Sequence, residues 1–169
     1  MKKLFTLLFA TLCMVACEKT TPDNTTITPV YVDLGLASGT EWKSANEMNP
    51  NDNKGFYDHA AAMTQFEANL PTQKQWAELR NSCTWTWIGE GYKVVGPNGN
   101  SIILPAAGYR SCSGIVGKEG MDGGYWSSTF RDEENVWSLY FNNNGDIFIH
   151  YDVRCFGRSV RLIHSKTEE

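Results

Sequence analysis

The chain has 169 residues, 12% of them aromatic, and a formal net charge of −4 at pH 7. This length suits one domain with a substantial core. An acidic chain lacks the basic excess that nucleic-acid binding requires, so we expect no nucleic-acid partner.

The first 16 residues predict a secretory signal peptide. Lys2 and Lys3 precede an apolar run that is too short to remain as a membrane span. Removal of this leader takes the formal charge from −4 to −6, because the two lysines are lost with it. Cys17 follows Val15 and Ala16, and this site resembles the lipobox of bacterial lipoproteins. The resemblance implies that Cys17 is acylated and holds the protein to a membrane. An ordinary leader with an incidental cysteine is the alternative.

Residues 17–29 predict a flexible tether, because they are rich in Thr, Pro and Asn and hold one aliphatic residue. The aromatic-rich part that follows predicts a folded domain over residues 30–165. We therefore expect a protein of the bacterial cell envelope, lipid-anchored to the outer membrane. The side of the membrane, periplasm or cell surface, is left open.

Two helices are predicted after two short strands at residues 31–36 and 40–45. In residues 55–68, Phe56, Ala60, Met63 and Phe66 recur at three- and four-residue intervals, which indicates an amphipathic helix. Residues 70–83 give a clearer signal. Thr72 followed by a glutamine three residues later is a capping box, and the sequence then continues with one apolar stripe.

Strands dominate the rest of the chain. Runs at residues 84–89, 92–96 and 101–109 are separated by Gly and Asn-Gly breaks, and residues 136–153 form a second hairpin around Asn144-Gly145. A last strand is predicted at residues 159–164. Trp85 and Trp87 share one face of their strand, which suits either a ligand platform or the inside of the core. Early helices and late antiparallel strands predict an α+β fold.

Several other motifs do not match the phosphate or metal sites that they resemble. Glycine-rich residues 113–124 lack the Ser or Thr that a phosphate loop needs after its lysine, so we expect a surface loop there. The three histidines have no metal-ligand spacing, and we expect each to be exposed or half-buried. Residues 131–135 and 49–55 are acidic or Asn-rich. Both are interpreted as turns, and calcium binding at residues 131–135 is the alternative.

Three cysteines remain after the leader and Cys17 are set aside, namely Cys83, Cys112 and Cys155. They allow at most one internal disulfide. We favour the pair Cys112 and Cys155, and the other pairings stay open.

The chain resembles the Fibrobacter succinogenes major paralogous domain family in the order of six segments. These segments are YVDLGLASGTEW, LPTQKQWAEL, CTWTW, GYKVVGPNGNSIILPAAGYR, GGYWSST and GRSVRLI. The Leu-Pro-Thr helix start and the terminal strand are also similar to the formylglycine-generating enzyme superfamily. Both resemblances imply a C-type-lectin-like fold, with two helices packed on small twisted antiparallel sheets and long loops on one side. In such a fold the strand of Trp85 and Trp87 belongs to the central packing, so the resemblance favours a place in the core for both side chains over a ligand platform.

Departures from these families shape the functional expectation. Ala45 stands where family members often carry a cysteine, so Cys83 is expected to be a free thiol. The closely spaced copper-binding cysteines of the formylglycine-generating enzymes have no counterpart, and neither do the calcium motifs of sugar-binding lectins. We therefore expect no metal, no cofactor and no catalytic residues.

The expected function is a non-catalytic binding or adhesion domain whose ligand is a glycan or a protein. A copper-dependent oxidase and a structural subunit of a surface assembly are the alternatives. Loops on a rigid scaffold usually carry binding residues, so we expect the ligand near residues 111–124. The candidate ligand-binding residues are Tyr109, Arg110, Tyr125, Trp126, Arg131, Asp132 and Glu133.

Overall fold

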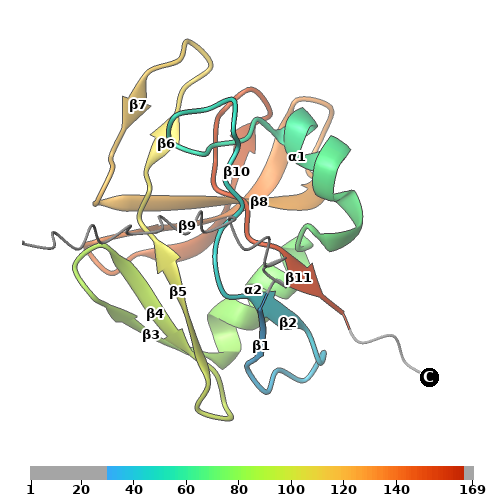
Figure 1. Cartoon of the computed structure of the whole chain (residues 1–169), viewed down its shortest axis with the longest axis vertical. Helices are drawn as coiled ribbons and strands as arrows, with labels where there is room; N and C mark the ends of the chain where they lie inside the picture. The colour runs from blue at the N-terminus through green and yellow to red at the C-terminus, as the bar shows by residue number, and fades with distance from the viewer. Residues whose placement is uncertain (1–29, 166–169) are drawn as a thin grey trace, which may run out of the picture.

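The computed structural model describes residues 30–165 (Figure 1). The predicted signal peptide, the acylation site Cys17 and the tether lie outside the described residues. Within the described part the fold is α+β, as predicted, with small antiparallel sheets and two α-helices. No helix in this part is long and apolar enough to cross a membrane.

The first and last strands of the domain meet in one small sheet. Its strands are β1 (Tyr31–Asp33), β2 (Glu41–Lys43) and β11 (Ile163–His164), in the order β1-β2-β11. Trp42 on β2 pairs with Val32 on one side and Ile163 on the other, and its side chain is fully buried. The two ends of the domain are therefore adjacent. All three strands are shorter than the sequence predicts.

Both predicted helices are present: α1 (His59–Phe66), followed by a 3-10 turn η1 (Glu67–Asn69), and α2 (Gln73–Ser82). The capping box of α2 is confirmed, because the Thr72 hydroxyl accepts from the Gln75 N–H and the Gln75 side chain accepts from the Thr72 N–H. The predicted apolar stripe of α1 is confirmed in part, because Met63 and Phe66 pack against the core. Ala60 is exposed, whereas His59 and Ala62 are buried.

The middle of the chain forms a meander of β3 (Thr84–Trp87), β4 (Gly91–Val95) and β5 (Ser101–Pro105). Trp85 and Trp87 are half-buried on the inner face of β3 and pack edge-on against Tyr92, at centroid distances of 5.7 and 5.2 Å. Thr84 and Thr86, which alternate with the two tryptophans, are exposed. The interpretation of these tryptophans as part of the core is confirmed.

A small hairpin of β6 (Tyr109–Arg110) and β7 (Val116–Gly117) follows, and β7 lies within the predicted surface loop at residues 113–124. The largest sheet comes next, with the order β10-β9-β8. Its strands are β8 (Asp122–Phe130), β9 (Asn135–Asn142) and β10 (Ile147–Val153). The predicted hairpin of β9 and β10 is confirmed, whereas β8 was not predicted.

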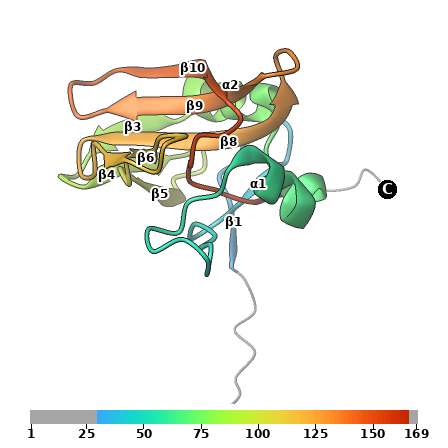
Figure 2. The same cartoon turned by 90° about the horizontal axis from the view of Figure 1, so that it is seen from above.

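Two hydrophobic clusters lie on opposite faces of the β8–β9 pair. Tyr125, Leu139 and Phe141 join the cluster that α2 covers, and Trp126 and Val136 join the cluster beside α1. Figure 2 shows β8, β9 and β10 side by side in one layer, with α1 on one side of it. Alternation along a strand thus places neighbouring residues in different cores.

Candidate functional site

Two of the predicted ligand-binding residues belong to the core. Tyr125 and Trp126 are each 0% exposed. The Tyr125 hydroxyl donates to the Pro105 carbonyl at 2.8 Å, and the Trp126 indole N–H donates to the Tyr57 carbonyl at 2.8 Å. Their assignment to ligand binding is therefore wrong. The free edge of β8 is covered by residues 108 and 159, which form isolated bridges to Gly123 and Tyr125.

Tyr109 and Arg110 are half-buried on β6. The Tyr109 ring lies 6.0 Å from the Phe156 ring, centroid to centroid, and is used for packing. Arg110 donates from Nε to the Asp52 carboxylate at 2.7 Å. Burial would raise the pKa of Asp52, but hydrogen bonds from two backbone N–H groups and from Arg110 outweigh it and hold this pKa below its ordinary value.

Arg131, Asp132 and Glu133 lie in the exposed turn between β8 and β9. The Arg131 guanidinium stands 3.4 Å from the centroid of the Tyr151 ring. Asp132 closes the turn by accepting from the backbone N–H groups of Glu134 and Asn135 at 3.0 and 2.8 Å. The Asn135 side-chain amide also donates to it and lowers the pKa of Asp132. Interpretation as a turn accounts for these contacts.

Cys112 and Cys155 form a disulfide, with their Cα atoms 5.1 Å apart, and the favoured pairing is confirmed. Cys83 is a free thiol. The copper-oxidase hypothesis requires two thiolates from Cys112 and Cys155, and the disulfide leaves none at these positions. Within residues 30–165, no group of three or more His, Cys, Asp or Glu side chains is placed to hold a metal ion.

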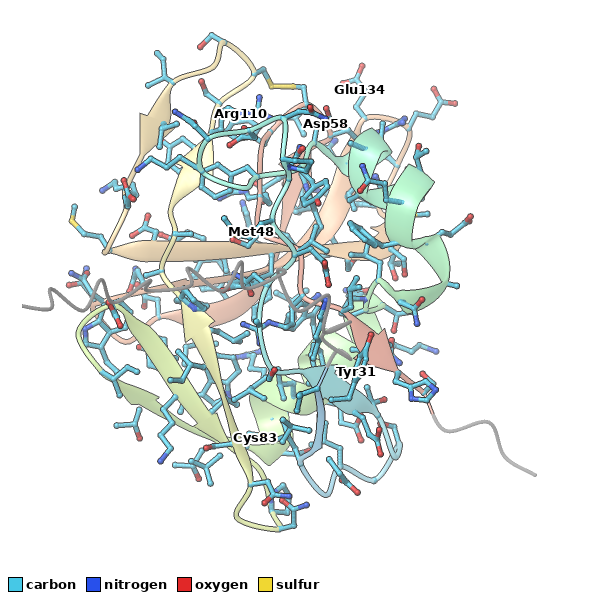
Figure 3. All side chains as sticks on the ribbon, viewed as in Figure 1. Tyr31, Met48, Asp58, Cys83, Arg110 and Glu134 are labelled. Atoms are coloured by element: carbon cyan, nitrogen blue, oxygen red, sulfur yellow. A yellow bond between two sulfur atoms is a disulfide. The ribbon has the colours of Figure 1, made fainter. Side chains whose placement is uncertain are left out.

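An open hollow of about 790 Å³ lies beside this disulfide and collects part of the predicted site. We call it the disulfide hollow. Its lining residues are Asp58, Ala60, Arg110, Cys112, Glu133, Glu134, Val153, Arg154 and Cys155. Figure 3 shows Arg110, Asp58 and Glu134 close together at one end of the molecule, beside the yellow disulfide bond. Arg110 and Glu133 were predicted as ligand-binding residues, and Cys112 and Cys155 were predicted as a disulfide. The other lining residues were not predicted.

The missed residues come from three separate elements. Asp58 is the N-cap of α1, where its carboxylate accepts from the Ala61 N–H at 2.8 Å. Arg154 donates from Nη1 to the Glu133 carbonyl at 3.1 Å and so connects the end of β10 to the acidic turn. The sequence could have indicated Arg154 by its position, because it is a charged residue directly before the predicted disulfide cysteine Cys155. The contribution of Asp58 depends on how α1 docks, which no local pattern states.

Some charged side chains of the disulfide hollow already have partners within the protein, and others do not. Arg110 is paired with Asp52, and Asp58 is used as a helix cap. Glu133 and Glu134 are exposed, and neither has an ion pair among the described residues. Arg154 is used in its hydrogen bond to the Glu133 carbonyl and lies over the Phe130 ring, so the groups that remain available to a ligand are the two carboxylates.

The expectation that His59 is exposed or half-buried is wrong, because this first residue of α1 is fully buried. Its Nε2 lies 3.0 Å from the Ser127 carbonyl, and its ring packs edge-on against Trp126 and Phe130. Burial lowers the pKa of His59. It lies in the core beside Trp126 and does not line the disulfide hollow.

Comparison of the chain with protein-family models, curated proteins and solved structures gave no match. Membership in the Fibrobacter succinogenes major paralogous domain family stays a prediction from the motifs.

Proposed function

We propose that this chain is a lipid-anchored protein of a bacterial cell envelope whose domain binds a ligand in the disulfide hollow without catalysing a reaction. One observation carries this proposal. Side chains from four separate segments converge on an open hollow, and the Cys112–Cys155 disulfide joins two of those segments at its wall. Such fixed rims with projecting polar side chains are typical of binding sites.

The fold we propose is C-type-lectin-like. Three features support it: the adjacent ends of the domain in β1 and β11, two helices packed on small antiparallel sheets, and a disulfide-linked loop region at one end. The motif segments quoted above give the same assignment independently of these features.

The ligand we propose is a polypeptide segment with basic side chains. The exposed carboxylates of Glu133 and Glu134 suit lysine or arginine, with which carboxylates form charge-assisted hydrogen bonds. None of the nine lining residues is aromatic, so the hollow offers no flat ring on which the apolar face of a sugar could pack. For this reason a protein ligand is preferred to a glycan.

Peptide binding tests this function. The probe is a hexapeptide of alternating lysine and glycine, compared with the same peptide acetylated on its lysines. We expect saturable binding of the first that weakens with added salt, and binding at least about tenfold weaker for the second. The double change Glu133→Gln and Glu134→Gln should remove the difference between the two peptides.

The matched control changes two exposed glutamates elsewhere, Glu67→Gln and Glu90→Gln, and should leave peptide binding unchanged. Equal loss of binding in the control would mean that net charge, and not the hollow, attracts the peptide. Binding of neutral oligosaccharides in place of the peptide would contradict the choice of ligand. No binding of either probe would leave the proposed function without support.

The anchor is tested separately on the whole cell. Cys17→Ala should move the protein from the membrane fraction to the soluble fraction and abolish incorporation of a labelled fatty acid. A protein that stays in the membrane fraction after this change would contradict lipid anchoring. Protease treatment of intact cells then distinguishes surface from periplasmic display.

A further inference from the structure

A second hollow, of about 410 Å³, lies apart from the first and shares no lining residue with it. We call it the Arg161 hollow. It lies between the segment after β2, the turn at residues 54–55, the end of β5 and the segment before β11. Met48, which lines it, is separated in Figure 3 from the group around the disulfide. Its volume is at the lower end of the range, about 300–1,000 Å³, that is usual for small-molecule pockets.

Arg161 lines this hollow although the residue is only 1% exposed. Its guanidinium donates from Nε to the Asn46 amide oxygen at 2.9 Å, from Nη1 to the Lys43 carbonyl at 2.7 Å and from Nη2 to the Ile103 carbonyl at 2.7 Å. All three acceptors are neutral. A guanidinium carries five N–H donors, and besides these acceptors the neutral Tyr125 hydroxyl also contacts it, so every hydrogen-bond partner of Arg161 is uncharged.

Arg161 has no salt-bridge partner among the described residues, although the Glu47 carboxylate attracts it from a greater distance. Glu47 lines the hollow but pairs with Lys43, and Lys54 pairs with Glu119 at 2.8 Å. No carboxylate of residues 30–165 lies within salt-bridge distance of Arg161. A buried charge is costly unless it is paired, and a ligand carboxylate would supply the missing partner.

The lining surface of the hollow is mostly apolar, although Ser44, Asn46, Glu47, Lys54 and Ser159 also contribute to it. Met48, from the segment after β2, and Ile103, Pro105 and Ala107, from the end of β5 and the residues that follow it, contribute the apolar part. An apolar wall with one buried cation at its base is suited to a ligand that carries one carboxylate on a compact apolar body. Neutral or cationic ligands would leave Arg161 uncompensated.

We propose that the Arg161 hollow is a second binding site, specific for a small carboxylate with a compact apolar body. The carboxylate could belong to a free acid or to the C-terminus of a peptide, since both present the same group. This inference does not rest on the proposed function, because the two hollows have no residue in common.

The first test is a calorimetric titration of the full chain in a mild non-ionic detergent. The probes are 3-phenylpropionate and its neutral isostere 3-phenylpropionamide, together with glycyl-phenylalanine in free and C-amidated forms. We expect at least one carboxylate to bind in a 1:1 ratio, and its amide to bind about tenfold more weakly or worse. Binding by the free acid or by the peptide acid each supports the site and identifies the source of the carboxylate.

Ala45→Trp locates the binding, because Ala45 lines the hollow from an exposed position, where a larger side chain can enter the space without disturbing the core. It should weaken carboxylate binding by about tenfold or more. Ala37→Trp, at an exposed position that lines neither hollow, is the matched control and should bind normally. Arg161→Lys should also weaken binding, provided that circular dichroism shows a folded protein.

Three results would overturn the proposal: no carboxylate binding up to about 10 mM, equal affinity for acid and amide, or unchanged affinity in Ala45→Trp. The double change Glu133→Gln and Glu134→Gln should not alter carboxylate binding. Failure of this site and failure of the peptide site are therefore observed separately.

Discussion

Tyr140 is held on β9 by a hydrogen bond that its hydroxyl donates to the Asp122 carboxylate at 2.8 Å. Burial and this bond together raise the pKa of Tyr140 to about 12, from an ordinary value of 10.0. A group whose pKa is higher in the folded state stabilises the fold below its unfolded pKa. We therefore expect the contribution of Tyr140 to be complete below about pH 10 and to disappear as the pH rises through about 12.

Asp122→Asn tests this coupling, because it removes the charge that opposes ionisation of the phenol. The pKa of Tyr140 should move back toward its ordinary value, as followed by NMR of tyrosine labelled at Cζ. Tyr140→Phe should reduce the loss of unfolding free energy between pH 10 and 12, and Tyr31→Phe is the control for removing a hydroxyl. An unchanged Tyr140 titration in Asp122→Asn would contradict the assigned cause.

Cys83 is the free thiol of the domain, and burial, with a smaller effect of Glu78, raises its pKa to about 11. Only the thiolate is nucleophilic, so about a thousandth of Cys83 is reactive at pH 8. A chain of residues 20–169 should show one thiol per molecule in unreduced denaturant. In the native state its alkylation should be slow and should accelerate about a hundredfold from pH 8 to pH 10. Three titratable thiols would contradict the disulfide.

At the scale of elements, α2 depends on its capping box. Thr72→Ala removes the hydroxyl that accepts from the Gln75 N–H and should lower the unfolding free energy by about 1 kcal/mol in urea titrations. Thr64→Ala is the matched control, because this exposed hydroxyl only donates back to the Ala60 carbonyl within α1. Its effect should stay within about 0.5 kcal/mol. Equal losses of unfolding free energy in the two variants would show that the capping hydrogen bond of Thr72 does not stabilise α2 specifically.

Features set by near neighbours in the chain were predictable, and α2 and the β9–β10 hairpin are examples. Strand β8 was not predicted because Gly123 and Gly124 weaken its local signal. Both glycines are needed because distant parts of the chain pack closely against them. A Cβ on Gly123 would lie 2.1 Å from the Phe141 ring, and one on Gly124 would lie 2.5 Å from the Arg158 guanidinium. The same long-range packing buries Tyr125 and Trp126 and brings Asp58 to the disulfide hollow, so local patterns could not place them.

At the scale of the whole molecule, the Cys112–Cys155 disulfide ties the β6–β7 hairpin to the segment after β10, across 43 positions of the chain. A closed loop of this length stabilises the fold by about 4 kcal/mol in the chain-entropy account. The double change Cys112→Ser and Cys155→Ser should therefore lower the unfolding free energy by about 2–4 kcal/mol, as measured by denaturant titration.

The two hollows should respond differently to the loss of this disulfide. Cys112 and Cys155 line the disulfide hollow, whereas the Arg161 hollow is formed by segments that the bond does not join. Peptide binding in the double serine variant should weaken while carboxylate binding persists, both measured by calorimetry at a temperature where the variant is folded. The backbone bonds between Arg110 and Gly157, at 3.0 and 2.7 Å, still connect the same segments. If peptide binding were retained, these backbone bonds, and not the disulfide, would be what shapes the disulfide hollow.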